Sequence, residues 1–240
     1  MSGQALYTSA FTPPTSNLTA VPGTQLLTLQ DNRFKDNSVN AIPLLTLSVA
    51  PTIQAISPWE PASSWSASAN GGSMYFNGTT DYLNLPASPI FNIGTNDFTI
   101  EAWVYPIAYG ATVAGASLLQ TNTGAVTGYA LNLGESKTRC RFISNGTGAW
   151  ADNVVAAVGP DLNCWSHVSV VRSGTNLSIY INGTLQGTTA IASSFTLNGS
   201  SAQATVGYYN EGTNIRFLNG YISNLRIVNG SSVYLSLIHI

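Results

Sequence analysis

Glu101 is the acidic residue placed best for catalysis, because it lies within the regular segment FTIEAWVY, from Phe98 to Tyr105. Glycoside hydrolysis uses two carboxyl groups that flank the scissile bond, about 5 to 10 Å apart. The segment holds no second acidic residue beside Glu101. We therefore expect no catalytic residues and a protein that is not an enzyme, with glycoside hydrolase as the less favoured alternative. Glu101 either orients a sugar hydroxyl or pairs with an arginine or backbone groups beneath a loop.

Histidine offers little further chemistry. The chain has two histidines, His167 and His239, and His239 lies in a terminal segment that we attribute to adapter sequence below. A Ser-His-Asp triad would have to use His167, and a metal site with two histidine ligands is excluded. His167 lies in the strand-like segment WSHVSVV, which favours a structural role, and no Gly-x-Ser-x-Gly nucleophile motif occurs.

Sugar recognition is the other chemistry that these residue types support, because aromatic faces stack on sugar rings and small polar groups bond their hydroxyls. Strand alternation places Trp103 and Tyr105 on the same side as Glu101. Other aromatic residues lie in polar stretches, where a core role explains them less well. The candidate ligand-binding residues are Glu101, Trp103, Tyr105, Trp150, Asp152, Tyr208, Tyr209 and Asn210. Packing of Trp103 and Trp165 within the fold remains an open alternative.

Rigid strands must position these side chains, and the clearest strand signal is a β-hairpin from Trp165 to Thr184, WSHVSVVRSGTNLSIYINGT. Apolar and polar residues alternate in both arms, and four small turn-forming residues join them. We expect the core-facing residues to pair across the two arms, Val168 and Val170 with Ile179 and Ile181. Asn182 and Gly183 then supply the positive φ angles of a second tight turn.

Similar short segments recur along the chain. We expect strands at 24–30, within 42–56, and at 73–76, 82–85, 98–105, 117–120, 129–133, 139–144, 154–157, 204–208 and 220–228. Pro13 and Pro14 exclude regular pairing near the N-terminus, and 58–72 reads as a loop. Ten or more short strands with Gly-, Ser-, Thr- and Asn-rich turns predict an all-β antiparallel two-sheet jelly-roll sandwich with little helix.

Composition excludes several classes of function. Of 240 residues, 8% are charged, and the formal net charge is −2, so no nucleic-acid partner is expected. No apolar run approaches the roughly 18 residues of a membrane helix, so no membrane insertion is expected, and no signal peptide is visible at the N-terminus. For Cys140 and Cys164, one bridge between neighbouring strands and two buried free thiols both stay open.

Four ordered segments carry a family resemblance: FNGTTDYLNLP, NDFTIEAWVYP, the hairpin WSHVSVVRSGTNLSIYINGT, and VGYYNEG with FLNGYISNLRIVNG. In this order and at these separations they resemble the laminin G-like branch of the concanavalin A-like lectin/glucanase superfamily. The resemblance extends over residues 22–234, since TQLLTLQ with Asp36-Asn37-Ser38 is similar to the usual opening of these domains. It implies two packed antiparallel sheets, with sugars or protein partners bound on a concave sheet or on rim loops.

The resemblance also bears on catalysis and on metal binding. Hydrolytic relatives of the laminarinase type carry Glu-x-Asp-x-x-Glu on one strand, whereas this chain has only Glu101 there. Asp81 occupies a rim turn where related domains often carry an acid, and it is the candidate calcium ligand. Calcium ligation would draw on Asp81, Asp97, Asp152 or Glu211, with backbone carbonyls. Calcium is thus a possible cofactor, and no other is expected.

The two ends of the chain resemble each other, since GQALYTS at 3–9 aligns with GSSVYLS at 230–236, 227 positions later. A repeat of this kind suggests a tandem array, in which residues 1–21 form a linker and the end of a preceding copy. Such arrays of Ser-, Thr- and Asn-rich jelly rolls resemble virion-associated proteins of bacteriophages. The final LSLIHI, residues 235–240, equals one reading frame of a transposase adapter used in DNA library preparation, and we expect it to be a sequencing artefact of metagenomic origin.

Two functions remain open from the sequence. One is a carbohydrate-binding domain that attaches a virion-associated or adhesin-like protein to a glycan or a cell-surface polysaccharide. The other is a purely structural repeat, whose partners are other virion or adhesin proteins. Either function predicts a virion-associated or extracellular location.

Overall fold

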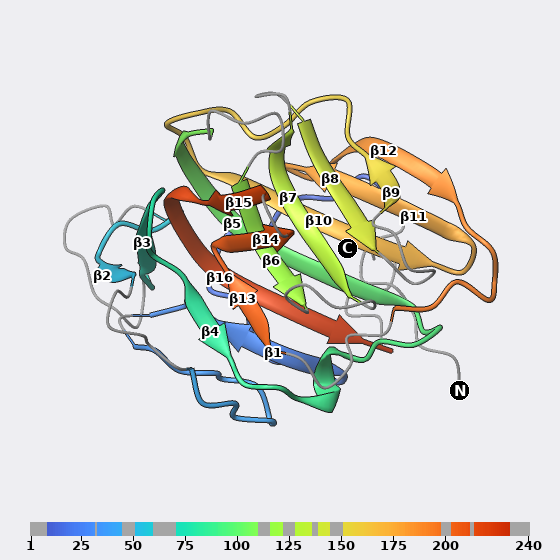
Figure 1. Ribbon diagram of the computed structural model, residues 1–240, viewed down its shortest axis with the longest axis horizontal. Coiled ribbons are helices and arrows are strands. Elements are labelled where there is room, and N and C mark those ends of the chain that lie inside the picture. The colour runs from blue at the N-terminus through green and yellow to red at the C-terminus, as the bar shows by residue number, and fades with distance from the viewer. Residues whose placement is uncertain are drawn as a thin grey trace, which may run out of the picture.

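A computed structural model describes residues 9–31, 33–44, 51–59, 71–109, 116–121, 128–135, 139–144, 151–197, 203–211 and 214–230. Within them the chain forms two large antiparallel sheets and a separate two-stranded hairpin (Figure 1). Helix in the described part is limited to one 3-10 turn, η1 (Pro89–Phe91), and no helix there is long and apolar enough to cross a membrane. The predicted all-β two-sheet sandwich is confirmed.

The larger sheet, called sheet A, has eight strands. Strand β16 is long enough to pair with β5 on one side and, on the other, with β3 along its first half and β1 along its second half. The strands of sheet A are β12 (Thr184–Ala190), β11 (Asn176–Ile181), β10 (Ser166–Ser173), β5 (Phe98–Ala108), β16 (Asn219–Asn229), β3 (Ser73–Asn77), β2 (Thr52–Gln54) and β1 (Thr24–Thr28).

The smaller sheet, called sheet B, has six strands, which in spatial order are β4 (Leu83–Leu85), β13 (Ala204–Val206), β6 (Ala116–Thr121), β7 (Tyr129–Glu135), β8 (Arg139–Ser144) and β9 (Ala151–Val155). The additional hairpin joins β14 (Tyr208–Glu211) to β15 (Asn214–Phe217). It packs on sheet B, because the fully buried ring of Tyr209 contacts Ala130 and Ile143 on the face turned away from sheet A.

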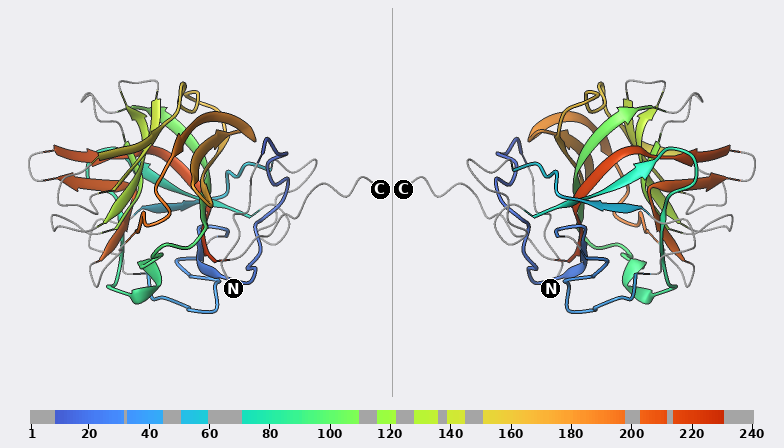
Figure 2. Two further views of the ribbon diagram at one scale, coloured as in Figure 1. Left: turned by 90° about the vertical axis from the view of Figure 1, so that its right-hand side faces the viewer. Right: turned by 90° about the vertical axis from the view of Figure 1, so that its left-hand side faces the viewer.

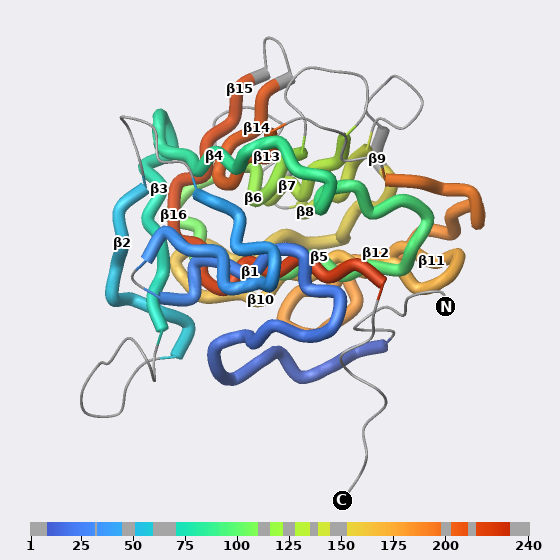
Figure 3. Tube along the Cα trace, turned by 90° about the horizontal axis from the view of Figure 1, so that it is seen from below, coloured from blue at the N-terminus to red at the C-terminus, as the bar shows by residue number. Residues whose placement is uncertain are grey.

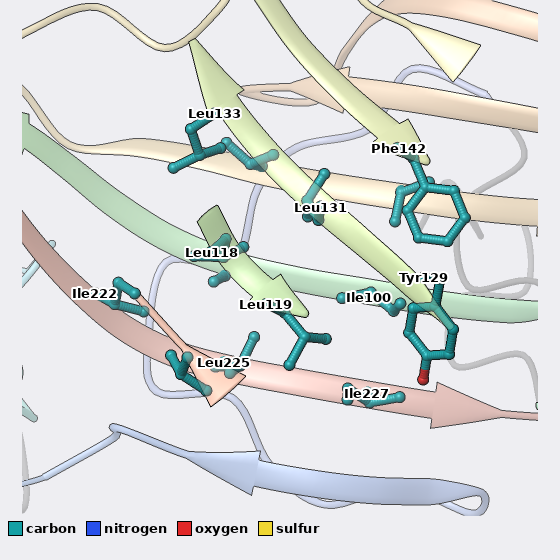
Figure 4. Close-up of a cluster of buried hydrophobic side chains, with 14 of the residues drawn as sticks. Ile100, Leu118, Leu119, Tyr129, Leu131, Leu133, Phe142, Ile222, Leu225 and Ile227 are labelled. Carbon is teal, nitrogen blue, oxygen red and sulfur yellow. The ribbon is translucent and has the colours of Figure 1, made fainter. Parts of the chain in front are cut away.

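The core lies between the two sheets. Apolar side chains of β5 and β16, such as Ile100 and Ile227, point towards Leu119 and Leu131 of sheet B (Figure 4). Tyr129 is also fully buried there, and its hydroxyl donates a hydrogen bond of 3.1 Å to the carbonyl of Phe91 in η1. Because one face of each sheet is buried, the alternation of apolar residues fixes the register of the strands.

The predicted hairpin register is confirmed. Val168 pairs with Ile181, and Val170 pairs with Ile179. The outward residues of the first arm, His167 and Ser169, lie on the opposite face of sheet A, as the alternation requires. In β5 the residues Phe98, Ile100, Ala102 and Val104 enter the core, which leaves Thr99, Glu101, Trp103 and Tyr105 on the outer face.

Several local predictions differ from the structure. Strand β9 spans 151–155 rather than 154–157, and the predicted strand 204–208 is divided at Gly207, whose φ of 79° turns the chain out of sheet B into β14. Strands β12 and β15 were not predicted. Cys140 and Cys164 are both free, but Cys164 is exposed, because it lies in the turn before β10.

Residues 9–21, called the N-terminal strap, have no regular secondary structure, as Pro13 and Pro14 predict, yet they pack against the domain. Figure 3 shows them along the outer face of sheet A, and Figure 2 shows the β14–β15 hairpin on the opposite side. The amide of Phe11 donates to the carbonyl of Gly183, and the side chain of Leu18 is 4% exposed. A segment predicted as linker therefore packs as part of the domain. Residues 1–8 and 231–240 lie outside the described residues, so the tandem repeat and the adapter remain predictions.

Candidate functional site on the outer face of sheet A

Glu101 lies at the centre of the outer face of sheet A, in a fully buried polar cluster. Its Oε1 accepts hydrogen bonds from Nε and Nη2 of Arg226 at 2.8 and 2.6 Å, and its Oε2 lies 3.0 Å from Nε2 of His167. Each of these three side chains is at most 1% exposed. Removing one member of a buried ion pair leaves an uncompensated charge, so the three groups depend on one another.

The N-terminal strap closes this cluster from solvent. The carbonyl of Thr19 accepts a hydrogen bond of 2.9 Å from Nη1 of Arg226, and the Phe11 ring packs edge-on against His167 at 5.7 Å. Of the two roles left open for Glu101, the geometry matches the structural one, a carboxylate paired with an arginine beneath a connecting segment. His167 is likewise a packed residue of the sheet.

Beyond the cluster, four of the partly exposed aromatic side chains on the outer face of sheet A form a continuous run, which we call the aromatic row: Tyr75, Tyr105, Trp165 and Tyr221. Tyr221 of β16 pairs in register with Tyr75 of β3 on one side and with Tyr105 of β5 on the other. Their ring centroids lie 5.2 and 5.6 Å from that of Tyr221, and Trp165 lies 5.6 Å from Tyr105. The row therefore crosses three neighbouring strands and reaches the start of β10.

This row holds ring faces, edges and phenolic hydroxyls on a rigid sheet. Trp103 lies between the row and the buried cluster, in edge contact with His167 at 5.4 Å and with Trp59 at 6.0 Å. The rings of the row meet at steep angles, so each presents a different part of its surface to solvent. Such a surface suits a ligand that combines apolar C–H faces with hydroxyl groups.

Of the predicted site residues, the structure brings Trp103 and Tyr105 together on this surface. Tyr75 and Tyr221 were not predicted as members of this surface, although both lie in segments with the alternation of a strand. The missing information was the register, because Tyr75 and Tyr221 are 146 positions apart in the sequence and become neighbours only through the pairing of β3 with β16.

The strap separates the aromatic row from a groove of about 280 Å³ on the same face, over β10, β11 and β12. The groove is lined by small polar residues such as Ser178, with Val171 and Leu185 as apolar walls. Tyr180 belongs to both regions, because it lines the groove and packs against the strap residue Phe11 at 5.4 Å. Burial raises the pKa of Tyr180.

The predicted residues Tyr208, Tyr209 and Asn210 lie on the β14–β15 hairpin, away from the aromatic row. Tyr209 is buried beneath Arg216, whose guanidinium carbon lies 4.3 Å from the ring centroid. Tyr208 points to the other side of the hairpin and stacks on Tyr82 at 4.7 Å. The pKa of Tyr208 is raised by burial, against a hydrogen bond with Asn210 that lowers it. Tyr208 with Tyr82 is thus a second partly exposed aromatic group.

The remaining predicted residues offer less to a site. Trp150 lies outside the described residues, and Asp152 is described only as a backbone position of β9, paired with Ile143. Asp81 is 6% exposed, and its two carboxylate oxygens accept hydrogen bonds from Asn77 and Thr80 within its own turn. No group of three His, Cys, Asp or Glu side chains gathers in the part of the chain that is described, and calcium binding at Asp81 with backbone carbonyls stays a prediction.

Sequence comparison gives one family match. The laminin G family model, described as concanavalin A-like lectin/glucanases superfamily, matches residues 77–232. This range includes β4 to β16 and three members of the aromatic row, Tyr105, Trp165 and Tyr221. A comparison with curated protein sequences gives no match.

Solved structures share the fold at low sequence identity. The binding domain of Paraclostridial Mosquitocidal Protein 1 has a TM-score of 0.63 at 14% identity over 89% of this chain and 50% of its own. The binding domain of botulinum neurotoxin serotype G has a TM-score of 0.62 at 16% identity over 88% and 48%. Domain 4 of a GH43 extracellular arabinanase from Geobacillus stearothermophilus, in complex with arabinotriose, has a TM-score of 0.50 at 16% identity over 75% and 82%. This chain thus spans about half of the toxin binding domains.

Proposed function

Because this chain belongs to the concanavalin A-like lectin/glucanases superfamily, we propose that it is a non-catalytic carbohydrate-binding domain that holds its sugar on the aromatic row of sheet A. The observation that carries the proposal is the register of Tyr75, Tyr221 and Tyr105, three partly exposed rings side by side on adjacent strands. Adjacent strands lie about 4.8 Å apart, so the row is long enough to contact more than one sugar ring.

The chemistry of the row supports a neutral sugar rather than a charged ligand. Glu101 and Arg226, the nearest charged groups described on this face, neutralise each other beneath the strap. What remains accessible is aromatic carbon with phenolic hydroxyls, which stack on and hydrogen-bond to sugars. The arabinanase domain of the same fold was solved with arabinotriose, so arabino-oligosaccharides belong among the first candidates.

The test is a glycan array followed by calorimetric titration of the best ligand. Tyr221→Ala and Tyr105→Ala should each weaken binding about tenfold or more, which corresponds to ~1.4 kcal/mol. Tyr221→Phe keeps the ring and should retain binding within about threefold. Tyr208→Ala, on the hairpin beyond sheet B, is the matched control and should leave affinity unchanged. The proposal fails if the parent binds no glycan, or if both alanine variants of the row bind as tightly as the parent.

The proposal includes a setting, which is a tandem virion-associated or adhesin-like protein. Two features support it: the repeat of GQALYTS at 3–9 by GSSVYLS at 230–236, and the packing of the strap that follows the first of them. A strap fixed on sheet A would hold a preceding copy in a defined orientation. A parent sequence without a second copy beside this one would count against this setting and would leave sugar binding unaffected.

A further inference from the structure

The groove over β10, β11 and β12 is open to solvent and takes no part in the proposed function. Its volume of about 280 Å³ is near the lower end of ligand pockets in proteins, which begin at about 300 Å³. Side chains of β11 form its floor, and β10 and β12 supply its two sides. The lining residues are Val171, Ser173, Asn176, Ser178, Tyr180, Leu185 and Thr188. Asn176, Leu185 and Thr188 are exposed, so a small ligand has both room and access.

A β-bulge in β12 explains how its side chains reach the groove. Ser178 pairs with Thr188 and Tyr180 pairs with Leu185, so two residues of β12 separate partners that only one residue of β11 separates. Strict alternation would place Leu185 and Thr188 on opposite faces, because they are three positions apart. The extra residue brings both to the outer face, and bulges often re-aim side chains in this way beside binding sites.

The bulge is fixed from behind by the chain around β9, which lies beside β12 (Figure 1). The carbonyl of Gln186 accepts a hydrogen bond of 2.9 Å from the amide of Ala157. Gly187 packs so closely that a Cβ there would clash with the carbonyl oxygen of Val155. The positions of the groove side chains on β12 are therefore set before a ligand binds, which lowers the entropic cost of binding.

The groove offers hydroxyl and amide groups without charge. None of the seven described residues that line it is charged. The hydroxyl of Ser178 donates to that of Thr188 at 3.0 Å, and each hydroxyl can both donate and accept. The side-chain amide of Asn176 adds a donor and an acceptor on the same strand. Such a lining suits a neutral ligand that carries several hydroxyls of its own.

The position of β11 argues against a peptide as this ligand. Peptides that bind to sheets commonly add a strand to a free edge, but β11 pairs with β10 on one side and with β12 on the other. Only side chains are left to bind, and these are mostly small and polar. Leu185, at 47% exposed, adds one apolar contact. Hydroxyls beside a single apolar contact match a sugar ring, which has hydroxyl groups and C–H faces.

We propose that this groove is a second carbohydrate site, which takes one neutral sugar unit. The hydroxyls of Ser178 and Thr188 and the amide of Asn176 hydrogen-bond to the sugar, and Leu185 contacts its C–H face. The site goes beyond the proposed function, because the strap separates it from the aromatic row and it binds without stacking. The two sites share no residue, so each can fail in experiment without the other.

The experiment follows the side-chain amide signals of Asn176 and the backbone amide signals of Ser178 and Thr188 in the 15N-labelled chain. The ligands are the methyl glycosides of glucose, galactose, mannose and arabinose, and the blocked peptide TPPTSN, which copies residues 12–17 of the strap. At least one glycoside should shift these signals saturably, and the peptide should not. The proposal is wrong if no glycoside shifts them, or if the peptide alone does.

Variants on β12 separate binding from folding. Thr188→Val keeps the shape of the side chain without its hydroxyl and should weaken the glycoside about threefold or more, as the loss of one hydrogen bond predicts. Thr188→Ser restores the hydroxyl and should restore the affinity, which a defect in folding alone would not explain. Parent-like affinity of Thr188→Val would contradict the site.

The apolar contact has a matched control. Leu185→Ser should also weaken the glycoside, whereas Leu162→Ser, at a position of similar exposure outside the groove, should not. Equal effects of the two changes would count against the groove. Tyr221→Ala should leave the groove signals responsive while it removes part of the aromatic row. If it abolishes their response, the sugar binds only on the aromatic row and the second site does not exist.

Discussion

The carbonyl of Thr19 accepts a hydrogen bond of 2.9 Å from Nη1 of Arg226, a residue 207 positions further along the chain. This bond joins the N-terminal strap to the buried ion pair of Arg226 with Glu101. The strap lies across the outer face of sheet A. The aromatic row is on one side of the strap, and the groove over β10, β11 and β12 is on the other. The strap is therefore expected to contribute to the stability of the domain, although it forms no strand.

Substitution of a strap residue tests this expectation. Leu18 is 4% exposed, so Leu18→Ala should lower the free energy of unfolding by about 2–4 kcal/mol. Leu162→Ala is the matched control, because Leu162 is 44% exposed, and its cost should stay within about 0.5 kcal/mol. Urea denaturation measures both. Equal values would show that the strap does not pack on the sheet in solution.

The ion pair beneath the strap should behave as a coupled unit. Arg226→Met leaves the carboxylate of Glu101 buried without its guanidinium partner, which should cost about 3–5 kcal/mol. Glu101→Leu combined with Arg226→Met removes both charges, so the double variant should be more stable than Arg226→Met alone. Arg139→Met, at an exposed position of β8, is the control and should be near neutral. Additive losses from the two single changes would contradict the coupling.

The turn between β11 and β12 should tolerate replacement of its glycine less well than the turn between β10 and β11. Gly183 and Gly174 both have positive φ, 74° and 58°, so alanine strains either position. A Cβ on Gly183 would also clash with the carbonyl oxygen of Phe11, whereas one on Gly174 would meet nothing within 4 Å. Gly174→Ala should cost about 1 kcal/mol and Gly183→Ala clearly more, measured as free energies of unfolding.

The sequence predicted those parts of the fold that depend on local alternation. The register of Val168 with Ile181 follows from the turn and the pattern of the two arms alone, and so does the outward position of Glu101. Sequence patterns could not predict the partner of Glu101, because Arg226 lies on a strand 125 positions away. The same holds for the aromatic row, which exists only through the pairing of β16 with β3 and β5.

Segments without alternation were the least predictable. The strap reads as a linker because Pro13 and Pro14 exclude strand pairing, but its contacts use backbone carbonyls and single side chains, which leave no period in the sequence. The sequence indicated that Tyr209 is an aromatic residue in a loop, because its hairpin is short and polar. Its burial depends on Ala130 and Ile143, apolar residues at outward positions where polar residues would ordinarily stand.

Alkaline pH should destabilise the domain through Cys140, whose thiol is buried in the core. Burial raises the pKa of Cys140 from 9.0 to about 12. The unfolded chain therefore loses this proton above pH 9 while the folded chain keeps it, so the stabilising contribution is complete below pH 9 and declines from there up to pH 12. Cys140→Ala cannot show this decline. The difference in free energy of unfolding between the parent and this variant should therefore shrink by about 1.4 kcal/mol between pH 7.5 and pH 10.

Leu133→Ala is the control for this pH dependence, because Leu133 faces Cys140 in register and shares the same core without a titrating group. The difference in free energy of unfolding between Leu133→Ala and the parent should stay constant from pH 7.5 to pH 10. Burial also raises the pKa of the Tyr129 hydroxyl, but this affects all three proteins alike. Urea denaturation at the two pH values measures both differences in free energy of unfolding. If the difference for Cys140→Ala also stays constant, the thiol is accessible to solvent in the folded chain, and sheet A does not pack over β8 as described.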